Sequence, residues 1–383
     1  MVFNLDKQSL SDIGAVHTVS EILQQPKTWL KTFELVKGLE SEIKAFLEEV
    51  TNHPDYRIIL TGAGTSEFVG NSLVDHLRRK YGHRVESIAT TSIVSQPDLY
   101  FTKEMPTLLV SFARSGNSPE SMGAVYQAET ICDTLYHLVI TCNAEGKLAQ
   151  FESEHSKLLA INLPPETNDQ SLAMTSSFSN MYLAAFLAFN IDQLDQLHNQ
   201  VNLLIEEANE FISKGIPEVE KFVENHDFDR VVYLGSNYFK GIAQESALKM
   251  LELTSGQNAT FYDTGLGFRH GPKSFLNDST LTVLFTSGRS YPTLYELDLF
   301  NQLPKEVIVF DNGSEETYDK ASLRFNYNPN LEDSFVALLY LMVGQSLGVL
   351  SSLKAGLKPD APSPSGLISR VVQGVTLYDY KGE

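Results

Sequence analysis

Hydrophobic positions follow two patterns along this chain, which together predict alternating strands and helices. Short runs of consecutive apolar residues, many of them β-branched, end near a glycine or a group of hydroxyl side chains, as in Arg57–Gly62 and Arg230–Gly235. The segments between these runs are long enough for helices, and residues 18–50 carry apolar residues at helical spacing. Continuous apolar strands that alternate with helices are typical of parallel sheets covered on both faces. We therefore expect an α/β fold.

The strand pattern occurs twice at the same spacing, which indicates an internal repeat. The matching runs are 57–62 with 230–235, 108–112 with 281–285, and 137–143 with 306–312. Each run is followed by a segment long enough for a helix. The sequence therefore predicts two doubly wound parallel-sheet domains, each with three α/β/α layers.

Helical segments flank and connect the two repeats. Residues 18–50 keep an apolar stripe at helical spacing, with Pro26 as a break between two helices. Leu194–Asn225 suits a helical connector. We expect a helical extension at residues 1–50, a first domain at 51–205, and a second domain with a C-terminal tail at 206–383.

Composition narrows the classes of partner. The 383 residues are 42% hydrophobic and carry a formal charge of -19, which argues against a nucleic-acid or anionic-membrane surface. The longest apolar stretch that we identify, 181–191, is too short to span a bilayer, and the first residues lack a leader pattern. The two cysteines, Cys132 and Cys142, show no metal or disulfide spacing. We expect a cytoplasmic protein without nucleic-acid or membrane partners.

Acid/base chemistry is indicated by two neighbouring motifs. Glu245, Lys249 and Glu252 are spaced by four and three residues, so a helix over 243–254 places them on one face. His270 follows eighteen residues after Glu252, in the sequence Arg-His-Gly-Pro. Separately, these motifs are more typical of a solvated ion pair and of a turn histidine. Together they favour an active site.

Two loops at the predicted carboxyl ends of adjacent strands suit an anion. They are Gly62–Ser66 and Ala113–Ser121, both rich in glycine and hydroxyl side chains. Such loops at helix N-termini bind phosphate through backbone N–H groups, and Arg114 adds a charge-assisted donor. Ordinary helix caps are the alternative for each loop alone. A dinucleotide site is disfavoured, because the third glycine of its fingerprint is missing.

These motifs resemble those of tandem sugar isomerase (SIS) domain proteins, over about residues 18–380. The pieces that carry the resemblance are Gly-Thr-Ser at 64–66, Arg-Ser-Gly-Asn-Ser at 114–118, Glu-Ser-Ala-Leu-Lys-Met-Leu-Glu at 245–252 and His-Gly-Pro at 270–272. The chain looks most similar to the galactosamine-6-phosphate deaminase/isomerase group, also described as tagatose-6-phosphate ketose/aldose isomerases. It is related to the isomerase half of glucosamine-6-phosphate synthase.

The resemblance implies a role for each matched residue. Glu252 moves a proton between C1 and C2 of the sugar, His270 opens the ring, and Lys249 lies beside the glutamate. The sugar phosphate contacts implied by the match are at Gly64, Thr65, Ser66, Arg114, Ser115, Gly116, Ser118, Asp169, Thr175, Glu245 and Arg370. The family also implies a homodimer or higher homo-oligomer, with the histidine loop reaching the neighbouring subunit's site.

Two positions depart from the synthase pattern. Ala113 stands where that pattern has a serine, and Arg114 is a candidate replacement for the lost hydroxyl. Arg370 stands nearest to the tail lysine that takes the open-chain sugar in the synthase. Arginine stays protonated, so it orients a sugar or phosphate rather than forming a Schiff base.

The expected activity is conversion of D-galactosamine 6-phosphate to D-tagatose 6-phosphate and ammonia, with no metal or organic cofactor. Two alternatives remain open. One is aldose/ketose isomerisation of tagatose 6-phosphate or another hexose 6-phosphate, and the other is a non-catalytic sugar-phosphate sensor.

Overall fold

The chain divides into two compact units, each built from several separate segments. The computed structural model describes residues 1–304, 306–312, 318–363, 365–366, 368–371, 374–378 and 380. The first-sheet unit falls within residues 28–168, 176–198 and 368–383, and the second-sheet unit within residues 1–27, 169–175 and 199–367. Each of these units consists of three separate segments, whereas the domains expected from the sequence, with boundaries at residues 50 and 205, are continuous segments. That division remains a prediction for the sequence domains.

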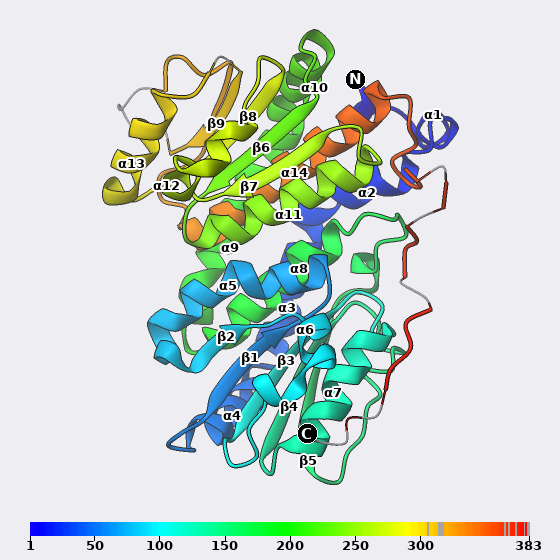
Figure 1. Ribbon diagram of the computed structural model, residues 1–383, viewed down its shortest axis with the longest axis vertical. Helices are drawn as coiled ribbons and strands as arrows, with labels where there is room; N and C mark the ends of the chain where they lie inside the picture. Colours follow the sequence, from blue (N-terminus) through cyan, green and yellow to red (C-terminus); the bar gives the residue numbers. More distant parts are fainter. Residues whose placement is uncertain are drawn as a thin grey trace. The chain divides into compact units, whose positions relative to one another are not determined.

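Each unit contains one five-stranded parallel sheet, and the two sheets share one topology. The first consists of β1 (Arg57–Thr61), β2 (Val85–Ser87), β3 (Thr107–Ala113), β4 (Leu135–Thr141) and β5 (Ser156–Asn162). The second consists of β6 (Arg230–Gly235), β7 (Ala259–Asp263), β8 (Thr280–Phe285), β9 (Val307–Asp311) and β10 (Leu323–Asn326). Their orders are β2-β1-β3-β4-β5 and β7-β6-β8-β9-β10 (Figure 1). The predicted pair of doubly wound sheets is confirmed.

Helices surround both sheets (Figure 1). Those that precede or accompany the first sheet are α1 (Lys7–Asp12), α2 (Val16–Leu23), α3 (Gln25–Gly38), α4 (Glu40–Thr51), α5 (Thr65–Tyr81), α6 (Thr90–Ser95), α7 (Pro119–Ile131) and α8 (Ser176–Phe189). Those that follow are α9 (Leu194–Glu210), α10 (Ile216–Asn225), α11 (Tyr238–Leu253), α12 (Gly265–Phe268), α13 (Ser290–Phe300) and α14 (Asp333–Lys354). The helix break near Pro26 and the helical connector are confirmed. A π-helical turn at Phe211–Gly215 separates α9 from α10.

The core of the first-sheet unit follows the strand alternation. Every residue of β3 and β4 is buried, so both faces of these central strands are covered. Ile59, Leu109 and Val139 point to one face, where they pack with Met122 and Val125 of α7. Neighbouring residues along a strand point to opposite faces, so the alternate positions pack against the other helical layer. Burial of both faces of the central strands explains the continuous apolar runs in the sequence.

The second-sheet unit repeats the arrangement with more aromatic residues. Val232, Leu234 and Leu284 pack on one face with Phe268 of α12 and Leu299 of α13. The ring of Tyr340, from α14, stacks on Phe285 of β8 with 4.7 Å between centroids. The Tyr340 hydroxyl donates to the carbonyl of Thr286 at 2.6 Å. The sheet is therefore covered on both faces.

Helix α14 corrects one expectation from the sequence. Its most apolar 18-residue window has a mean hydropathy of 1.7, and among the described residues its 22 residues form one helix long and apolar enough to cross a membrane. It is longer than the apolar stretch at 181–191 that we took as the longest. However, 94% of its most apolar window is buried within the protein, as in the core helix of a globular domain.

Helices α11 and α14 approach each other closely because α14 has glycines where they meet. A Cβ at Gly344 would lie 2.3 Å from the Ser246 Oγ, and one at Gly348 would lie 2.7 Å from a methyl of Leu253. The carbonyl of Lys249 is 3.4 Å from the same imagined Cβ at Gly348. The two glycines are one helical turn apart, so they form a continuous groove for α11.

We predict that Gly344→Val lowers the free energy of unfolding by about 1–3 kcal/mol, because the added side chain must push Ser246 and α11 away. Denaturant unfolding measures this change. Gly38→Val is the matched control, since no atom lies within 4 Å of a Cβ at Gly38. Equal effects of the two substitutions would contradict the close-packing argument.

Candidate active site

The loop between β1 and α5 brings two hydroxyl side chains to the carboxyl edge of the first sheet. A Cβ at Gly62 would lie 2.4 Å from the Ser66 carbonyl carbon, so the turn from strand to helix requires glycine there. Gly64 caps the helix with a φ of 55°, in the left-handed region that glycine favours. Thr65 and Ser66 are the first residues of α5, and both are buried. The predicted loop is thus confirmed as a helix N-terminus.

The loop between β3 and α7 is held by the segment that follows β4. Asn143 Nδ2 donates to the Ser115 carbonyl at 2.8 Å, and the Leu148 N–H donates to the Gly116 carbonyl at 3.0 Å. The C=O and N–H of a trans peptide point in opposite directions. The Gly116 N–H group therefore points away from that segment, as an anion-binding loop requires, whereas the Asn117 N–H donates to the Ser115 hydroxyl oxygen at 3.3 Å.

The two loops are neighbours because their strands are neighbours. β1 pairs with β3 in parallel, with Thr61 opposite Ser111. In a sheet of order 2-1-3-4-5, the chain leaves these two strands in opposite directions, and ligands bind in the crevice that results. The structure therefore places Thr65, Ser66, Ser115 and the loop serine Ser118 at one switch point.

Arg114 and Arg370 are brought together, although 256 residues separate them in sequence. The buried Arg114 guanidinium donates to the Arg370 carbonyl, and Arg370 Nη2 donates to Asn168 Oδ1 at 2.8 Å. The C-terminal tail also reaches α7, where a Cβ at Gly123 would lie 3.1 Å from a methyl of Leu377. The tail arginine thus lies beside the β3–α7 loop, and one hydrogen bond of Arg114 holds the tail.

The second-sheet unit carries a buried ion triad on α11. Lys249 Nζ lies 2.5 Å from Glu252 Oε2 and 3.4 Å from Glu245 Oε1. Lys249 and Glu245 are fully buried, whereas the Glu252 side chain is 24% exposed. The charged face is therefore packed into the unit and is not a solvated face. Glu252 has an anchored carboxylate whose outer part reaches solvent, which suits a proton carrier.

A buried carboxylate that the sequence did not reveal orders the 169–175 segment. Glu21, on α2, accepts hydrogen bonds from the Gln170 N–H at 2.5 Å, the Ser171 N–H at 3.2 Å and the Ser171 hydroxyl. Asp169 in turn accepts from the Thr175 N–H at 2.8 Å. Burial, together with the charge of Asp169, raises the pKa of Glu21 to about 7. No sequence motif marks Glu21, since the groups that donate hydrogen bonds to it come from a distant segment.

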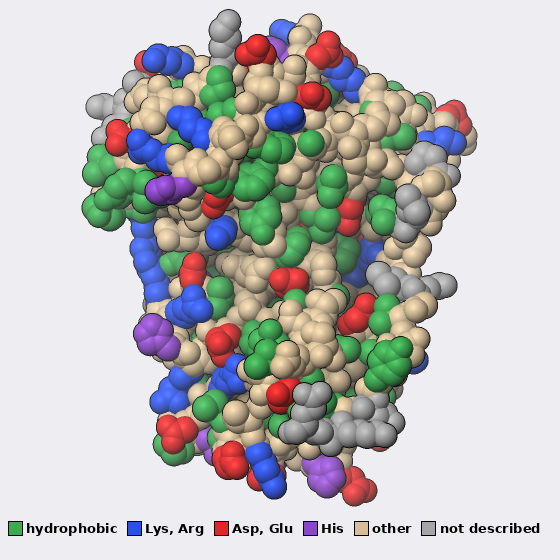
Figure 2. All heavy atoms as spheres, viewed as in Figure 1, with side chains coloured by type: hydrophobic (Ala, Val, Ile, Leu, Met, Phe, Trp, Pro, Cys, Tyr) green, Lys and Arg blue, Asp and Glu red, His purple; other side chains and the backbone are tan. Residues whose placement is uncertain are grey.

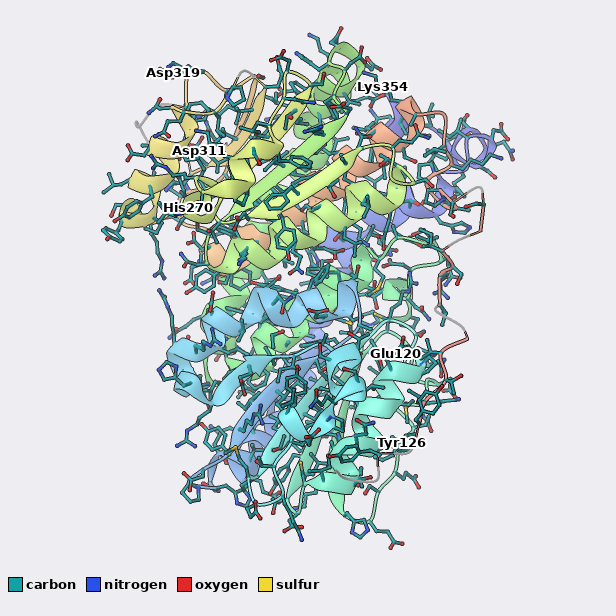
Figure 3. The ribbon with its side chains drawn as sticks, in the orientation of Figure 1. Glu120, Tyr126, His270, Asp311, Asp319 and Lys354 are labelled. Carbon is teal, nitrogen blue, oxygen red and sulfur yellow. The ribbon has the colours of Figure 1, made fainter. Side chains whose placement is uncertain are left out.

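His270 lies on the surface and apart from the ion triad. It lies two residues after the end of the short helix α12 and is exposed (Figure 3). No hydrogen bond or ion pair links it to Lys249 or Glu252 among the described contacts. The sequence places these groups eighteen residues apart, but the fold of this single chain does not bring their charged atoms into contact.

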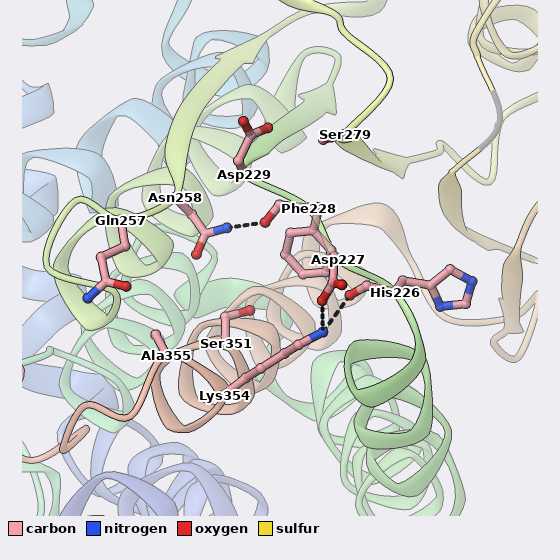
Figure 4. A pocket seen from close by; sticks show the side chains of 10 residues that line it. All are labelled: His226, Asp227, Phe228, Asp229, Gln257, Asn258, Ser279, Ser351, Lys354 and Ala355. Carbon is pink, nitrogen blue, oxygen red and sulfur yellow. Dashed lines mark hydrogen bonds and ion pairs between the residues drawn. The ribbon is translucent and has the colours of Figure 1, made fainter.

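A cavity of about 330 Å³ occupies the opposite edge of the second sheet, before the first residues of β6, β7 and β8 (Figure 4). Its lysine, Lys354, is engaged by the carbonyls of Val223 and His226 at 2.7 and 2.8 Å and by Asp227 at 2.7 Å. Ligands of open α/β sheets bind at the carboxyl ends of strands. This cavity therefore does not belong to the candidate active site.

The predicted residues fall into two groups, one in each unit. Those of the first-sheet unit are Gly64, Thr65, Ser66, Arg114, Ser115, Gly116, Ser118 and Arg370, and those of the second-sheet unit are Asp169, Thr175, Glu245, Lys249, Glu252 and His270. The first group has the donors for an anion, and the second has the acid/base groups.

Comparison with known proteins places this architecture among sugar-phosphate proteins. Residues 53–191 match the SIS domain family. Over 381 residues, 98% of this chain and 95% of the relative, the chain is 39% identical to D-galactosamine-6-phosphate deaminase AgaS of Shewanella sp. strain ANA-3.

Two crystal structures are similar over nearly the whole chain. One, from Clostridium novyi and provisionally described as a tagatose-6-phosphate ketose/aldose isomerase, has a TM-score of 0.95 at 40% identity and covers 99% of each chain. The tagatose-6-phosphate ketose/aldose isomerase of Escherichia coli has a TM-score of 0.85 at 34% identity, covering 95% of this chain and 97% of that one.

We predict that Glu21 makes the wild-type protein less stable as pH rises from about 4.5 to 7. Its pKa is higher in the folded protein than the ordinary 4.5, so folding favours the protonated form and loses that advantage across this window. Relative to Glu21→Gln, the wild type should lose on the order of 2–3 kcal/mol of unfolding free energy between pH 5 and 7.5. Denaturant unfolding at several pH values measures the difference. The exposed Glu34→Gln is the control. The prediction would be refuted if the unfolding free energies of wild type and Glu21→Gln changed in parallel with pH.

Proposed function

This chain belongs to the AgaS family of SIS-domain proteins, and we propose that it is an enzyme that converts D-galactosamine 6-phosphate and water to D-tagatose 6-phosphate and ammonia. The observation that carries the proposal is the partly exposed Glu252 carboxylate held by the buried Lys249. The name of the relative that is 39% identical over 98% of the chain supports the substrate. A phosphorylated sugar is charged and stays within cells, so we also place the protein in the cytoplasm.

The sugar phosphate is held by the two loops at the switch point of the first sheet. Thr65, Ser66, Ser115 and Ser118 supply hydroxyl donors, and the Gly116 N–H group supplies a backbone donor. Charge-assisted hydrogen bonds to phosphate are stronger than those between neutral groups. Arg370, held near Arg114, orients the sugar, and the net charge of -19 is overcome locally by these donors.

The chemistry consists of ring opening, proton transfer between C2 and C1, and hydrolysis. His270 opens the ring by moving a proton between the ring oxygen and the C1 hydroxyl, a task that suits an imidazole. Glu252 then takes the proton from C2 while O1 gains one, which leaves an enaminol with a C1–C2 double bond. Return of a proton to C1 leaves a C2 iminium with a CH₂OH group at C1. Water adds at C2, the C2–N bond breaks, and ammonia leaves with the ketose as the second product.

Lys249 has a supporting role in this sequence. Its ammonium lies 2.5 Å from Glu252 and 3.4 Å from Glu245, so it fixes the direction of the Glu252 carboxylate and balances its charge. Lys249 is fully buried and paired on both sides. It therefore positions the proton carrier and makes no covalent bond to the sugar.

Aldose/ketose isomerisation is the second candidate function. It is favoured by the 34% identical Escherichia coli structure, which is a tagatose-6-phosphate ketose/aldose isomerase. The same C1–C2 proton transfer serves both reactions, and only the hydrolysis of the C2–N bond differs. The sensor interpretation has less support, because the named relatives are enzymes.

A homodimer supplies the histidine in this proposal. Figure 2 shows hydrophobic side chains gathered at the upper left, over the region of α12 and α13. The large apolar side chains exposed on these helices are Leu266 (48%), Tyr291 (68%), Leu294 (55%) and Tyr295 (39%). An exposed apolar patch of this kind favours a protein–protein contact. We propose that a second copy covers it, so that His270 acts in the neighbouring subunit's site.

We expect purified protein to release ammonia from galactosamine 6-phosphate, with little release from glucosamine 6-phosphate. The parallel assay follows aldose formation from tagatose 6-phosphate and ketose formation from galactose 6-phosphate. Interconversion of these hexose phosphates without ammonia from either amino sugar would replace the deaminase by the isomerase. If none of these substrates were converted, both the deaminase and the isomerase proposals would be refuted.

We expect Glu252→Gln to lower kcat about 10²–10⁴-fold with little change in KM, because the proton carrier is lost and the phosphate loops remain. Ser115→Ala should instead raise KM about tenfold, through the loss of one hydrogen bond to a charged group. Steady-state kinetics with the amino sugar phosphate measures both. The exposed Glu224→Gln is the control for a lost carboxylate. Full activity of Glu252→Gln would refute the mechanism.

We expect co-expressed Glu252→Gln and His270→Asn chains to regain activity, although each variant alone is inactive. Half of randomly mixed dimers are heterodimers, and each has one intact site of two, so about a quarter of wild-type activity should return. Light scattering gives the oligomeric state in parallel. A dimer without complementation would place His270 in its own subunit's site.

A further inference from the structure

The second repeat keeps the anion-binding loop of the first. In the first sheet this loop is Ser115-Gly116-Asn117-Ser118, and in the second it is Ser287-Gly288-Arg289-Ser290, between β8 and α13. An asparagine from the loop after the next strand holds each: Asn143 Nδ2 donates to the Ser115 carbonyl at 2.8 Å and Asn312 Nδ2 to the Gly288 carbonyl at 3.3 Å.

The loop after the first strand of each sheet also keeps its shape. Gly64 and Asn237 cap α5 and α11 with φ values of 55° and 54°. Asparagine tolerates this left-handed conformation better than most residues. Asn237 lines a cavity of about 300 Å³ together with Ser236, Thr264 and Tyr291, which is in the first turn of α13. This cavity therefore lies at the carboxyl edge of the second sheet, beside the first turn of α13.

The donors of the second loop are occupied by the chain's own carboxylate. Asp333, the first residue of α14, accepts from the Ser287 hydroxyl at 2.6 Å and from the Gly288 N–H at 2.9 Å. Its side chain is 9% exposed, and Arg289 Nε lies 4.0 Å from the same carboxylate. In the first repeat, by contrast, no carboxylate among the described residues accepts from Ser115, Gly116 or Ser118.

A second acidic residue contacts the loop but carries little charge at neutral pH. Glu296, on α13, accepts from the Ser287 N–H at 3.0 Å. Burial raises the pKa of Glu296 to about 8, and the charge of Asp333 adds to this, so Glu296 is mostly protonated at neutral pH. Asp333 is thus the resident anion of the loop. A carboxylate and a phosphate offer such N–H and O–H donors the same kind of charged oxygen.

We propose that Asp333 is a built-in anion that fills the phosphate loop of the second repeat, and that its removal opens this loop to phosphate or a phosphate monoester. The chain then takes one sugar phosphate, at the first repeat, because the equivalent loop of the second repeat is already occupied. Use of the first loop rests on the proposed function, whereas the occupation of the second loop by Asp333 does not.

The test counts bound inorganic phosphate per chain in wild type and Asp333→Ala, by equilibrium dialysis with labelled phosphate. Asp333→Ala should bind one phosphate more per chain than wild type. Glu332→Ala is the matched control, because this neighbouring acid is exposed and its loss changes the net charge equally. An equal count in wild type and Asp333→Ala, or the same gain in Glu332→Ala, would overturn the proposal.

The number of phosphates that Asp333→Ala gains over wild type tests this inference independently of the proposed function, whereas the total number bound does not. If the first loop binds no phosphate, the counts change from zero to one instead of from one to two. Repeating the comparison in a Ser115→Ala, Ser118→Ala background isolates the second loop. Failure of the increment with normal turnover of the sugar phosphate would reject Asp333 as the resident anion and leave the proposed function in place.

A second variant guards against misfolding. Asp333→Ser is compatible with the start of a helix and is too short to replace the carboxylate. Phosphate should raise the Tm of Asp333→Ala and Asp333→Ser by more than that of wild type, because the vacated donors of Ser287 and Gly288 gain an acceptor. A folded Asp333→Ser protein whose Tm responds to phosphate as wild type does would also overturn the proposal.

Discussion

The burial of one charge, that of Lys249, constrains much of the second-sheet unit. An ammonium removed from water costs several kcal/mol unless it is paired, so Lys249 requires carboxylates on both sides. Helical spacing provides them at Glu245 and Glu252, four residues before and three after. Burial also requires α14 to lie close, which Gly344 and Gly348 permit. The glycines, the ion triad and the orientation of Glu252 are therefore parts of one arrangement.

The two repeats use the same loop geometry for two purposes. Both sheets have the same strand order, and in both the loops after the first and third strands meet at one edge. In the first repeat the donors of the β3–α7 loop face no carboxylate among the described residues. In the second, the Asp333 carboxylate satisfies them and ties the start of α14 to the loop. The same local geometry thus stabilises the fold in one unit and is available to a ligand in the other.

The candidate anion site depends on local electrostatic interactions, although the protein as a whole is negatively charged. The chain carries a formal charge of -19, yet its candidate anion site uses backbone N–H groups, hydroxyls and two arginines. Fixed dipoles of this kind act over a few ångströms, while the charge of distant surface carboxylates is screened by salt. An acidic composition therefore argues against a nucleic-acid partner without excluding a phosphate pocket.

The amino-acid sequence by itself determined the repeat, the strand runs and the helical position of Glu245, Lys249 and Glu252. These features depend on local periodicity and on residue spacing, which a single sequence displays. It also indicated the two hydroxyl-rich loops, because a strand followed by glycine and serine leads into a helix N-terminus.

Only the tertiary structure decided the contacts between segments far apart in sequence. Examples are Glu21 with the 169–175 segment, Arg114 with Arg370, and Asp333 with the second loop. The sequence did not determine whether the charged face of α11 lies in solvent or in the core. Packing against α14 places it in the core. Such contacts depend on which surfaces meet when the chain folds, and no local pattern records that choice.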